Sequence, residues 1–484
     1  MNATLFRSVV YIAALCGLYL STAMLIPAMV DLYYGSDDWS VFTVSAALVG
    51  GLSLTAAMAT RGPPPAFTKR MGFLLVNVLW AVFSVVGAIP LYFSNLDLTF
   101  AQALFESISG ITTTGSTVIS GLDTLSRGIL MWRGLLAWLG GIGIVALGLF
   151  VLPFLRVGGV SFFKMESSDI GDKPFARIAT FTRAFMAVYV AITFACIVSY
   201  DIAGMSHFDA IVHAFSTVAT AGFGNHDTSF AHFDSLTILW ISTFFMTLCS
   251  LPFSILIVLV VKGRLDALRD PQILVFLGYI FAFALAAGLY NHLQNGIALP
   301  VALTHSFFNF SSILSTTGFA SEDYTLWGPF AVAAAFFATF MGGCSGSTAG
   351  GIKAYRFVIL FNIIVSGLKR LIYPNAVYSV RYGNQIVDAD TQRAVFLFFS
   401  AYIFIWAIGS MAMALAGYEF ATATSSVITA LSNVGPGIGP LIGPVGNFSM
   451  MQDPELLILS LAMLLGRLEV LTMLVLLVPI FWKS

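Results

Sequence analysis

Four short segments that end in glycine recur along the chain, and they constrain its fold more than any other feature. They read Thr-Thr-Thr-Gly115, Ala-Thr-Ala-Gly222, Ser-Thr-Thr-Gly318 and Ser-Asn-Val-Gly435. The glycines recur roughly every 100 residues, which is too wide for a solenoid repeat, so the repeated unit should be a small domain. Glycine permits positive φ, so consecutive backbone carbonyls in such a segment can be turned the same way.

The amino-acid composition indicates that these segments lie in a membrane. Apolar residues make up 58% of the chain and charged residues 9%, whereas about 25% of a soluble domain is charged. We therefore predict a polytopic membrane protein in contact with the lipid bilayer. Four such segments around one axis would form rings of carbonyl oxygens, which replace the water shell of a monovalent cation in a pore. The alternative is four unrelated glycine loops between membrane helices.

Each segment follows an apolar stretch that is too short to cross the bilayer. The first, Phe100–Ser109, would form about 15 Å of helix, half of a bilayer core of about 30 Å. It must enter the membrane and turn back, and non-helical backbone at that depth is tolerated only inside protein or beside a water-filled cavity. The other re-entrant stretches are predicted at 207–222, 298–318 and 422–435.

Around the re-entrant stretches we predict about ten full spans. They lie between Arg7 and Val30, at Val41–Ala59, Gly72–Tyr92, Ile129–Leu152, Phe181–Tyr200, Leu236–Val261 and Ile273–Tyr290, from Trp327 onward, and at Ala394–Ala416 and Leu456–Phe481. The predicted fold is an all-α polytopic membrane protein with four pseudo-symmetric helix–pore-loop–helix repeats around a central ion pore, preceded by an N-terminal two-helix hairpin. The hairpin is predicted at 1–68 and the repeats at 69–157, 158–263, 264–371 and 372–484.

The basic residues predict the orientation of the chain in the membrane. Most of them fall in loops of one parity, at Arg61–Arg70, Arg156–Arg183, Lys262–Arg269 and Lys369–Arg393, whereas Arg127 and Arg133 beside the first segment are exceptions. The positive-inside rule makes this side the cytoplasm, and an even number of spans places both termini there. Acidic residues such as Asp97, Asp123 and Asp227 fall on the opposite side, where they would raise the local concentration of cations.

A glycine-rich interruption divides the apolar stretch of the third repeat. Trp327–Arg370 as one helix would extend about 66 Å, twice the thickness of a bilayer, but residues 342–351 read Gly-Gly-Cys-Ser-Gly-Ser-Thr-Ala-Gly-Gly. This is not a phosphate-binding P-loop, because Ile352 precedes Lys353 and no hydroxyl residue follows the lysine. We expect the interruption to line or block the pore below the third segment; the alternative is a packing kink.

Arg467 lies inside the last apolar span, where an unpaired charge is costly. It is expected to face the protein interior and either to repel passing cations or to anchor the glycine-rich interruption. Packing between units through carbonyl caps is the structural alternative. Glu469 is two residues further on, so on a continuous helix the two side chains would point to opposite sides and could not pair.

Together these motifs resemble the TrkH/KtrB superfamily of potassium-translocating subunits, and the N-terminal hairpin is typical of its TrkH branch. The motifs are Thr-Thr-Thr-Gly115, Ser-Thr-Thr-Gly-Phe319, Ser-Asn-Val-Gly-Pro-Gly437, Gly-Ser-Thr-Ala-Gly-Gly-Ile-Lys353 and Gly-Arg-Leu-Glu469. The resemblance implies a homodimer in the bacterial inner membrane, potassium as the transported ion, and a cytoplasmic ring of TrkA-like nucleotide-binding regulatory subunits. The basic loops Arg156–Arg183 and Lys369–Arg393 would dock this ring, and a small hairpin is predicted at Ser379–Val387.

The resemblance also assigns roles to residues. The ion-coordinating residues would be Thr112, Thr113, Thr114, Gly115, Ala219, Thr220, Ala221, Gly222, Ser315, Thr316, Thr317, Gly318, Ser432, Asn433, Val434 and Gly435. The gating residues would be Gly342, Gly343, Ser345, Gly346, Ser347, Thr348, Gly350, Gly351 and Arg467. The second segment departs from the others, because Ala219 and Ala221 leave it few side-chain hydroxyls.

Two rival functions compete with the pore. A proton- or sodium-coupled potassium symporter would show helices broken in matching positions and membrane-buried acids; here one long helix is interrupted, and Glu106 and Glu469 are the candidate acids. An intramembrane enzyme would need a nucleophile or a metal constellation. The 6 histidines show no metal-ligand spacing, so no enzymatic activity is predicted, and without a basic run no nucleic-acid binding is predicted either.

Overall fold

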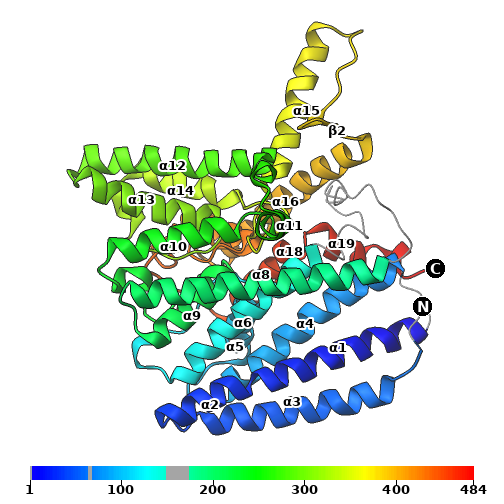
Figure 1. Ribbon diagram of the computed structural model, residues 1–484, viewed down its shortest axis with the longest axis vertical. Helices are drawn as coiled ribbons and strands as arrows, with labels where there is room; N and C mark the ends of the chain where they lie inside the picture. Colours follow the sequence, from blue (N-terminus) through cyan, green and yellow to red (C-terminus); the bar gives the residue numbers. More distant parts are fainter. Residues whose placement is uncertain (1–2, 64–67, 149–173, 484) are drawn as a thin grey trace.

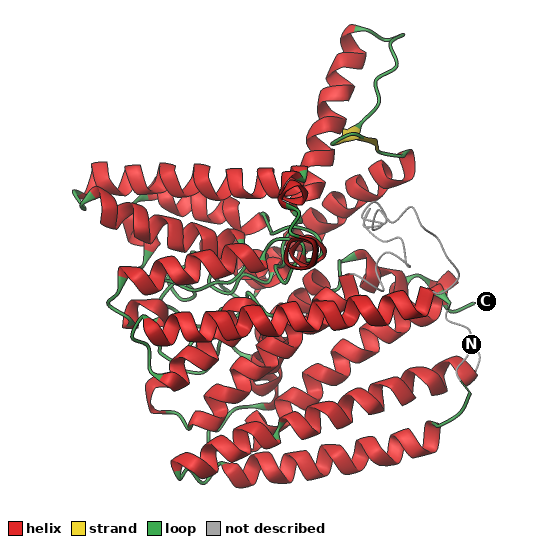
Figure 2. Ribbon diagram, viewed as in Figure 1, coloured by secondary structure: helices red, strands yellow, loops and turns green. Residues whose placement is uncertain are grey.

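The computed structural model describes residues 3–63, 68–148 and 174–483. Over these residues the chain consists of helices, connecting loops and one small hairpin of strands (Figure 2). Seven helices are long and apolar enough to cross a membrane, and the number rises to nine if each of two bent pairs counts as one span. The predicted all-α polytopic fold is therefore confirmed.

The chain begins with the predicted two-helix hairpin. α1 (Ala3–Ala23) and α2 (Leu25–Tyr34) together form one crossing, and α3 (Trp39–Thr60) returns beside α1. The hairpin packs on helices α4 and α6 of the unit that follows and lies along one edge of the molecule (Figure 1).

Four units of one kind follow, each made of a long helix, a short helix and one or two closing helices. The long helices are α4 (Lys69–Phe93), α8 (Pro174–Ile202), α12 (Pro271–Asn295) and α16 (Ala389–Leu415). The short helices are α5 (Phe100–Ile111), α9 (His207–Val218), α13 (Leu299–Leu314) and α17 (Phe420–Ser432). The closing helices are α6 (Arg127–Ala146), α10 (Leu236–Cys249) with α11 (Phe253–Lys262), α14 (Pro329–Phe340) with α15 (Ala354–Ile372), and α18 (Asp453–Arg467) with α19 (Leu471–Leu477). Short 3-10 helices lie in the connections, namely η1 (Leu122–Thr124), η4 (Ser229–His232), η5 (Leu265–Arg269), η6 (Tyr324–Trp327) and η7 (Pro479–Phe481).

The short helices have defined starts and stop inside the protein. At α5, the Thr99 hydroxyl accepts the backbone N–H of Gln102 while the Gln102 side chain accepts the N–H of Thr99, which forms a capping box. Ser206 caps α9 by accepting the N–H of Asp209. Each of these two helices has 12 residues, about 18 Å, which is too short to cross a bilayer. The prediction of re-entrant helices agrees with these lengths.

Two spans predicted to be continuous are bent. The predicted span Leu236–Val261 bends by 99° between α10 and α11, and Leu456–Phe481 bends by 113° between α18 and α19. Pro252 explains the first bend, because proline has no N–H for a helical hydrogen bond. At the second bend Glu469 and Val470 have positive φ, 59° and 21°. With the predicted division of α14 from α15, three closing helices are broken within the described residues, so the prediction of a single interrupted helix was wrong.

The start of α1 and the end of α19 lie on the same side of the molecule (Figure 1). α15 projects from the body and leads to β1 (Arg381–Tyr382) and β2 (Gln385–Ile386), which pair antiparallel. Gly383 lies in the turn with a φ of 55°, so the predicted hairpin at Ser379–Val387 is confirmed. The predicted basic surface from Arg156 to residue 173, the end of the predicted span at Leu152 and the predicted repeat boundary at 157 lie outside the described residues.

Candidate functional site

The four glycine segments share one backbone conformation. We number them segment 1 (Thr112–Gly115), segment 2 (Ala219–Gly222), segment 3 (Ser315–Gly318) and segment 4 (Ser432–Gly435). The residue two positions before each glycine has positive φ: 53° at Thr113, 50° at Thr220, 56° at Thr316 and 55° at Asn433. Such a conformation is uncommon outside glycine. Its recurrence at one position in all four segments argues against four unrelated loops.

The four segments close into a ring. Each glycine lies against the carbonyl oxygen of the residue that precedes the glycine of the next segment, so that an added Cβ would nearly overlap this oxygen. The distances from that Cβ are 2.3 Å for Gly115 to Ala221 O, 2.0 Å for Gly222 to Thr317 O, 1.9 Å for Gly318 to Val434 O and 2.8 Å for Gly435 to Thr114 O. Segment 4 thus returns to segment 1, and the sequence-predicted residues meet about one centre.

The carbonyl oxygens of this ring have no hydrogen-bond donor among the described residues. They belong to Thr114, Ala221, Thr317 and Val434, whose side chains are all fully buried. Buried backbone carbonyls are nearly always satisfied by protein or by water. Four unsatisfied oxygens, one from each segment of the ring, are groups that a dehydrated cation could satisfy.

The side-chain hydroxyls of the segments bond to one another and to neighbouring helices. The hydroxyls of Thr112 and Thr114 are 2.7 Å apart, and those of Ser315 and Thr317 are also 2.7 Å apart. In segment 4, Asn433 Nδ2 donates to Thr114 Oγ1 at 2.9 Å and so ties segment 4 to segment 1. Segment 2 has alanine at both equivalent positions, so it cannot form the hydroxyl pair of segments 1 and 3. Backbone, rather than side chain, is what all four segments have in common.

The loop between α14 and α15 lies under the ring. We call it the glycine-rich loop (residues 341–353). The Thr220 hydroxyl donates to Thr348 Oγ1 at 3.1 Å, and the Gly350 N–H donates to Thr316 Oγ1 at 2.5 Å. A Cβ on Gly350 would lie 2.5 Å from Ser432 O. The predicted gating segment therefore contacts three of the four segments. The contacts are made with Thr220, Thr316 and Ser432, which lie two or three residues before the glycines of their segments.

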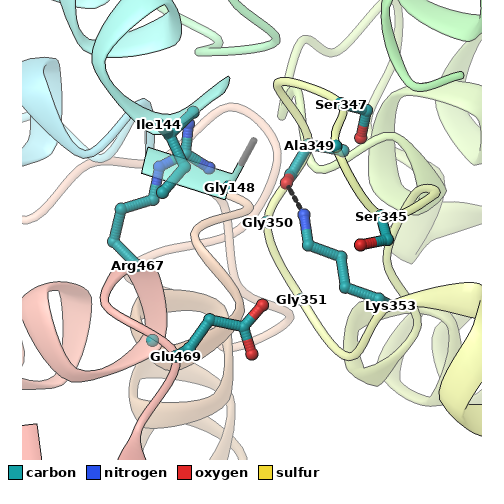
Figure 3. Close-up of a pocket in the computed structure, with 12 residues that line it drawn as sticks. Ile144, Gly148, Ser345, Ser347, Ala349, Gly350, Gly351, Lys353, Arg467 and Glu469 are labelled. Carbon is teal, nitrogen blue, oxygen red and sulfur yellow. Dashed lines mark hydrogen bonds between the residues drawn. The ribbon is translucent and has the colours of Figure 1, made fainter. Parts of the chain in front are cut away.

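Arg467 reaches this loop from the end of α18. It is 2% exposed, and its Nη2 donates to the carbonyl oxygen of Thr348 at 2.9 Å. Figure 3 shows Arg467 and Glu469 on one side of a small cavity and Ser345, Ala349 and Lys353 on the other. The cavity has a volume of about 30 Å³, enough for about one water molecule. The glycine-rich loop and Arg467 thus face each other across a cavity of only this size.

Glu469 pairs with a residue that the sequence did not single out. Its carboxylate accepts a hydrogen bond from the guanidinium of Arg356 on α15, which also lies 3.7 Å from the centre of the Phe398 ring. The expectation that Glu469 does not pair with Arg467 agrees with this geometry. Lys353 donates to the carbonyl oxygen of Ala349 and thereby closes the end of the glycine-rich loop.

A second buried ion pair holds the first two segments in place. Glu106 on α5 accepts a hydrogen bond from Arg133 on α6 at 2.8 Å, and the side chains are 0% and 2% exposed. Glu106 also accepts the N–H of Val118, just after segment 1, while Arg133 donates to Gly224 O, just after segment 2. Arg133 does not lie in one of the predicted cytoplasmic loops with most of the other basic residues. This unusual position is the feature of the sequence that could have indicated a buried acidic partner.

The break between α10 and α11 packs against the glycine-rich loop. The Cys344 N–H donates to Ser250 O at 2.9 Å, and the Phe253 N–H donates to Gly346 O at 2.9 Å. Because Arg467 also contacts this loop from the last residue of α18, the three broken helices meet below the ring.

Comparison with known proteins gives a consistent result over the full chain. A family model described as TrkH, cation transport protein, matches residues 42–483. The chain is 38% identical to the Trk system potassium uptake protein TrkI of Halomonas elongata, over 98% of this chain and 96% of that protein. It is 36% identical to the Trk system potassium uptake protein TrkH of Escherichia coli K12, over 99% and 100%. The crystal structure of the potassium transporter TrkH from Vibrio parahaemolyticus superposes with a TM-score of 0.92 at 33% identity, covering 99% of this chain and 100% of that one.

Proposed function

Because the chain belongs to the TrkH family of cation transport proteins, we propose that it takes up potassium ions through the ring formed by its four glycine segments. The ring of buried carbonyl oxygens, without donors among the described residues, is the observation that carries this proposal. In such a ring main-chain oxygens stand in for the water molecules of the hydrated ion. The relatives named as potassium uptake proteins support potassium as the ion.

The segments would act through position rather than through chemistry. No covalent bond is made or broken. The chain needs only to replace the water molecules around an ion with oxygens that bind it about as strongly as the water did. The shared positive φ two residues before each glycine supports a backbone that is set before the ion arrives. All 16 residues of segments 1 to 4 remain proposed ion-coordinating residues.

The glycine-rich loop is proposed as the gate. Its contacts with segments 2, 3 and 4 and the cavity of about 30 Å³ beneath the ring support a loop that obstructs the path of the ion. The proposed gating residues include Gly342, Gly343, Ser345, Gly346 and Ser347, with Thr348, Gly350 and Gly351 nearest the ring. Arg467 would hold the gate through Thr348 O and place a positive charge below the ring.

Replacement of Arg467 by alanine is expected to raise potassium flux or to weaken its regulation. The substitution removes the hydrogen bond to Thr348 O and the charge that would repel cations. Flux of a potassium analogue into liposomes that contain purified protein is the measurement, with Arg264→Ala as the control because Arg264 is 64% exposed and lies outside the proposed docking surfaces. Unchanged flux and stability in Arg467→Ala would remove the proposed gating role.

A proton- or sodium-coupled symporter remains the second candidate. The broken helices cannot argue against it, because three closing helices are broken rather than one. The two acids that the sequence singles out do argue against it. Glu106 is held by Arg133 and Glu469 by Arg356, so neither carboxylate is free to carry a proton in exchange.

Purified protein in liposomes separates the two functions. For a pore, we expect a current that reverses at the Nernst potential for potassium and does not shift with a pH or sodium gradient. An obligatory symporter would shift its reversal potential with the gradient of the coupled ion, by an amount set by the stoichiometry. Empty liposomes are the control for leak.

The assembly is proposed from the same resemblance. We propose a homodimer in the bacterial inner membrane, regulated by a cytoplasmic ring of TrkA-like nucleotide-binding subunits. The basic stretch Lys369–Arg393, which contains the β1–β2 hairpin, would be one docking surface. Both termini would then lie in the cytoplasm, and the predicted unit boundaries at 1–68, 69–157, 158–263, 264–371 and 372–484 belong to the same proposal.

A further inference from the structure

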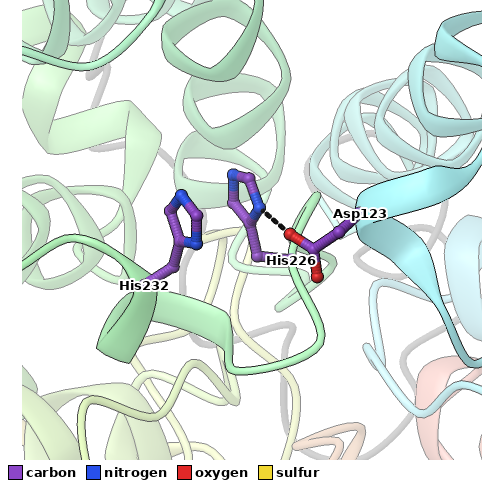
Figure 4. A group of neighbouring side chains, drawn as sticks. All are labelled: Asp123, His226 and His232. Carbon is purple, nitrogen blue, oxygen red and sulfur yellow. Dashed lines mark hydrogen bonds and ion pairs between the residues drawn. The ribbon is translucent and has the colours of Figure 1, made fainter.

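Three side chains with metal-binding atoms meet beside the ring, on the side opposite the glycine-rich loop. They are Asp123, His226 and His232, and one ligand atom from each lies within 4.8 Å of the others. Figure 4 shows the two imidazole rings face to face and Asp123 directed at His226. These histidines show no metal-ligand spacing in the sequence, because the third ligand lies about one hundred positions away in the chain.

The cluster joins the loops that follow segments 1 and 2. Asp123 lies on η1, His226 lies four residues after Gly222, and His232 is the last residue of η4. The loops are fixed to each other, because Asp227 accepts the backbone N–H groups of Gly121 and Leu122 at 3.1 and 3.2 Å. The relative positions of the two loops are therefore set by Asp227 and not by the three side chains of the cluster.

The two imidazoles are close enough for one metal ion to bind both after the rings turn. Their ring centres are 3.4 Å apart and their planes differ by 3°, and one ligand nitrogen of each lies within 4.8 Å of the other. Two nitrogens bound to one zinc ion at about 2.0–2.1 Å with tetrahedral angles are roughly 3.3 Å apart. Because a bound ion must lie in the plane of each ring, zinc would turn the rings out of their stacked arrangement.

The third donor is already directed at the same place. Asp123 Oδ1 is 2.5 Å from His226 Nδ1. The carboxylate of Asp209 lies 3.5 Å from the other ring nitrogen of His226. Two carboxylates therefore lie beside this imidazole. His226 Nε2 is buried and has no hydrogen-bond partner among the described residues, since Asp209 Oδ1 is 3.5 Å away.

We propose that Asp123, His226 and His232 form a binding site for zinc or a similar divalent transition metal at the mouth of the ring. Two imidazoles and one carboxylate suit zinc, whereas calcium and magnesium take oxygen ligands. Three protein ligands leave a fourth position for water, which is typical of an open site. The ion would take the place of the proton between His226 and Asp123.

Bound zinc would lower cation uptake. The ion adds two positive charges where Asp123, Asp209 and Asp227 otherwise present negative charge to an arriving cation, so the local cation concentration falls. It would also tie the loop after segment 1 to the loop after segment 2. This inhibitory effect rests on the proposed potassium uptake, whereas the metal site itself does not.

Zinc binding by the purified full-length chain, measured by calorimetry, tests the site without any transport. We expect about one zinc ion per chain and no comparable heat with magnesium or calcium. The variant His232→Asn, which keeps a similar shape but loses the imidazole, should bind at least roughly tenfold more weakly, since even indirect supports of a metal ligand affect affinity by 10–100-fold. His232→Cys supplies a different zinc ligand and should restore binding.

His207→Asn is the matched control. His207 is 90% exposed and lies 2.5 Å from Asp201 as a second His–Asp pair, and within the described part of the chain no other histidine is stacked on it. It should bind zinc as the wild type does, and it also controls for zinc bound by cysteine. Zinc affinity that is equal in His232→Asn and wild type, or lost equally in His207→Asn, would overturn the site.

Transport is the second arm of the experiment. Micromolar zinc outside cells should inhibit potassium uptake by wild type and His207→Asn, but not by His232→Asn. Binding without inhibition would keep the site and reject its effect on uptake. If uptake of potassium fails in the absence of zinc, the proposed function fails and the binding result stands alone.

Discussion

Gly318→Ala is expected to abolish potassium uptake. An alanine Cβ at this position would lie 1.9 Å from Val434 O, a backbone atom of the neighbouring segment. Left-handed backbone by itself costs an L-residue only about 1–2 kcal/mol, and Thr316 adopts it in the same segment with a φ of 56°. The clash therefore decides the outcome, because it is relieved only if segments 3 and 4 move apart and the ring opens.

The controls for this prediction lie in the same chain. At Gly278 in α12, no atom of the described residues lies within 4 Å of an added Cβ, so Gly278→Ala should transport potassium as the wild type does. Gly435→Ala, with its nearest oxygen at 2.8 Å, should retain the fold more readily and lose selectivity against sodium before it loses flux. Uptake into potassium-starved cells and monodisperse elution of the purified variants are the two measurements. Normal, selective uptake by Gly318→Ala would mean that the ring is not the path of the ion.

Glu469→Gln is expected to destabilise the folded protein strongly. The substitution keeps the shape of the side chain but removes the negative charge beside Arg356, which is fully buried. Breaking a buried ion pair by removing one partner costs about 3–5 kcal/mol, because a buried charge is left uncompensated. The thermal midpoint of unfolding in detergent should fall accordingly.

Two further variants identify the cause of this loss. Arg356→Met combined with Glu469→Gln should recover most of the stability, since a long apolar side chain at 356 can pack on Phe398 and neither position then carries a buried charge. Asp266→Asn removes one partner of the exposed Arg264–Asp266 pair, whose side chains are 64% and 56% exposed, and should leave the midpoint unchanged. A double variant that is no more stable than Glu469→Gln alone would exclude the uncompensated charge as the cause.

The central ring was predictable because every part of its signal is local. Each segment consists of small polar residues that end in glycine, and an apolar stretch too short for a bilayer precedes it. Both features lie within one short window of sequence, and the same window recurs four times. The length of α5 and the cost of unpaired backbone in lipid then require Thr112–Gly115 to face the interior. The positive φ at Thr113 and Asn433 was not predictable, since threonine and asparagine occur in many other conformations.

The broken closing helices were only partly predictable. Pro252 marks the break between α10 and α11, although the predicted span Leu236–Val261 runs across it. No such marker exists at the other bend, because Leu468, Glu469 and Val470 are all compatible with helix. The bend there coincides with the ion pair between Glu469 and Arg356, 113 residues apart in the chain. A contact at that separation cannot be inferred from one sequence.

The ion pairs and the histidine cluster share this difficulty. Arg133 and Glu106 lie on different helices, and Asp123 reaches His226 from another unit. In each case one member stands out in the sequence for its position or charge. The partner depends on how the units pack, which composition and spacing do not determine.

The closed circle of contacts from segment 1 through segment 4 belongs to a single polypeptide. In a pore assembled from identical subunits, one codon change alters every quarter at once. Here each segment is encoded separately, so a mutation can change one segment and leave the other three unchanged. The two alanines of segment 2 illustrate such a difference. An experimenter has the same freedom and can measure what a single segment contributes to the proposed selection of ions.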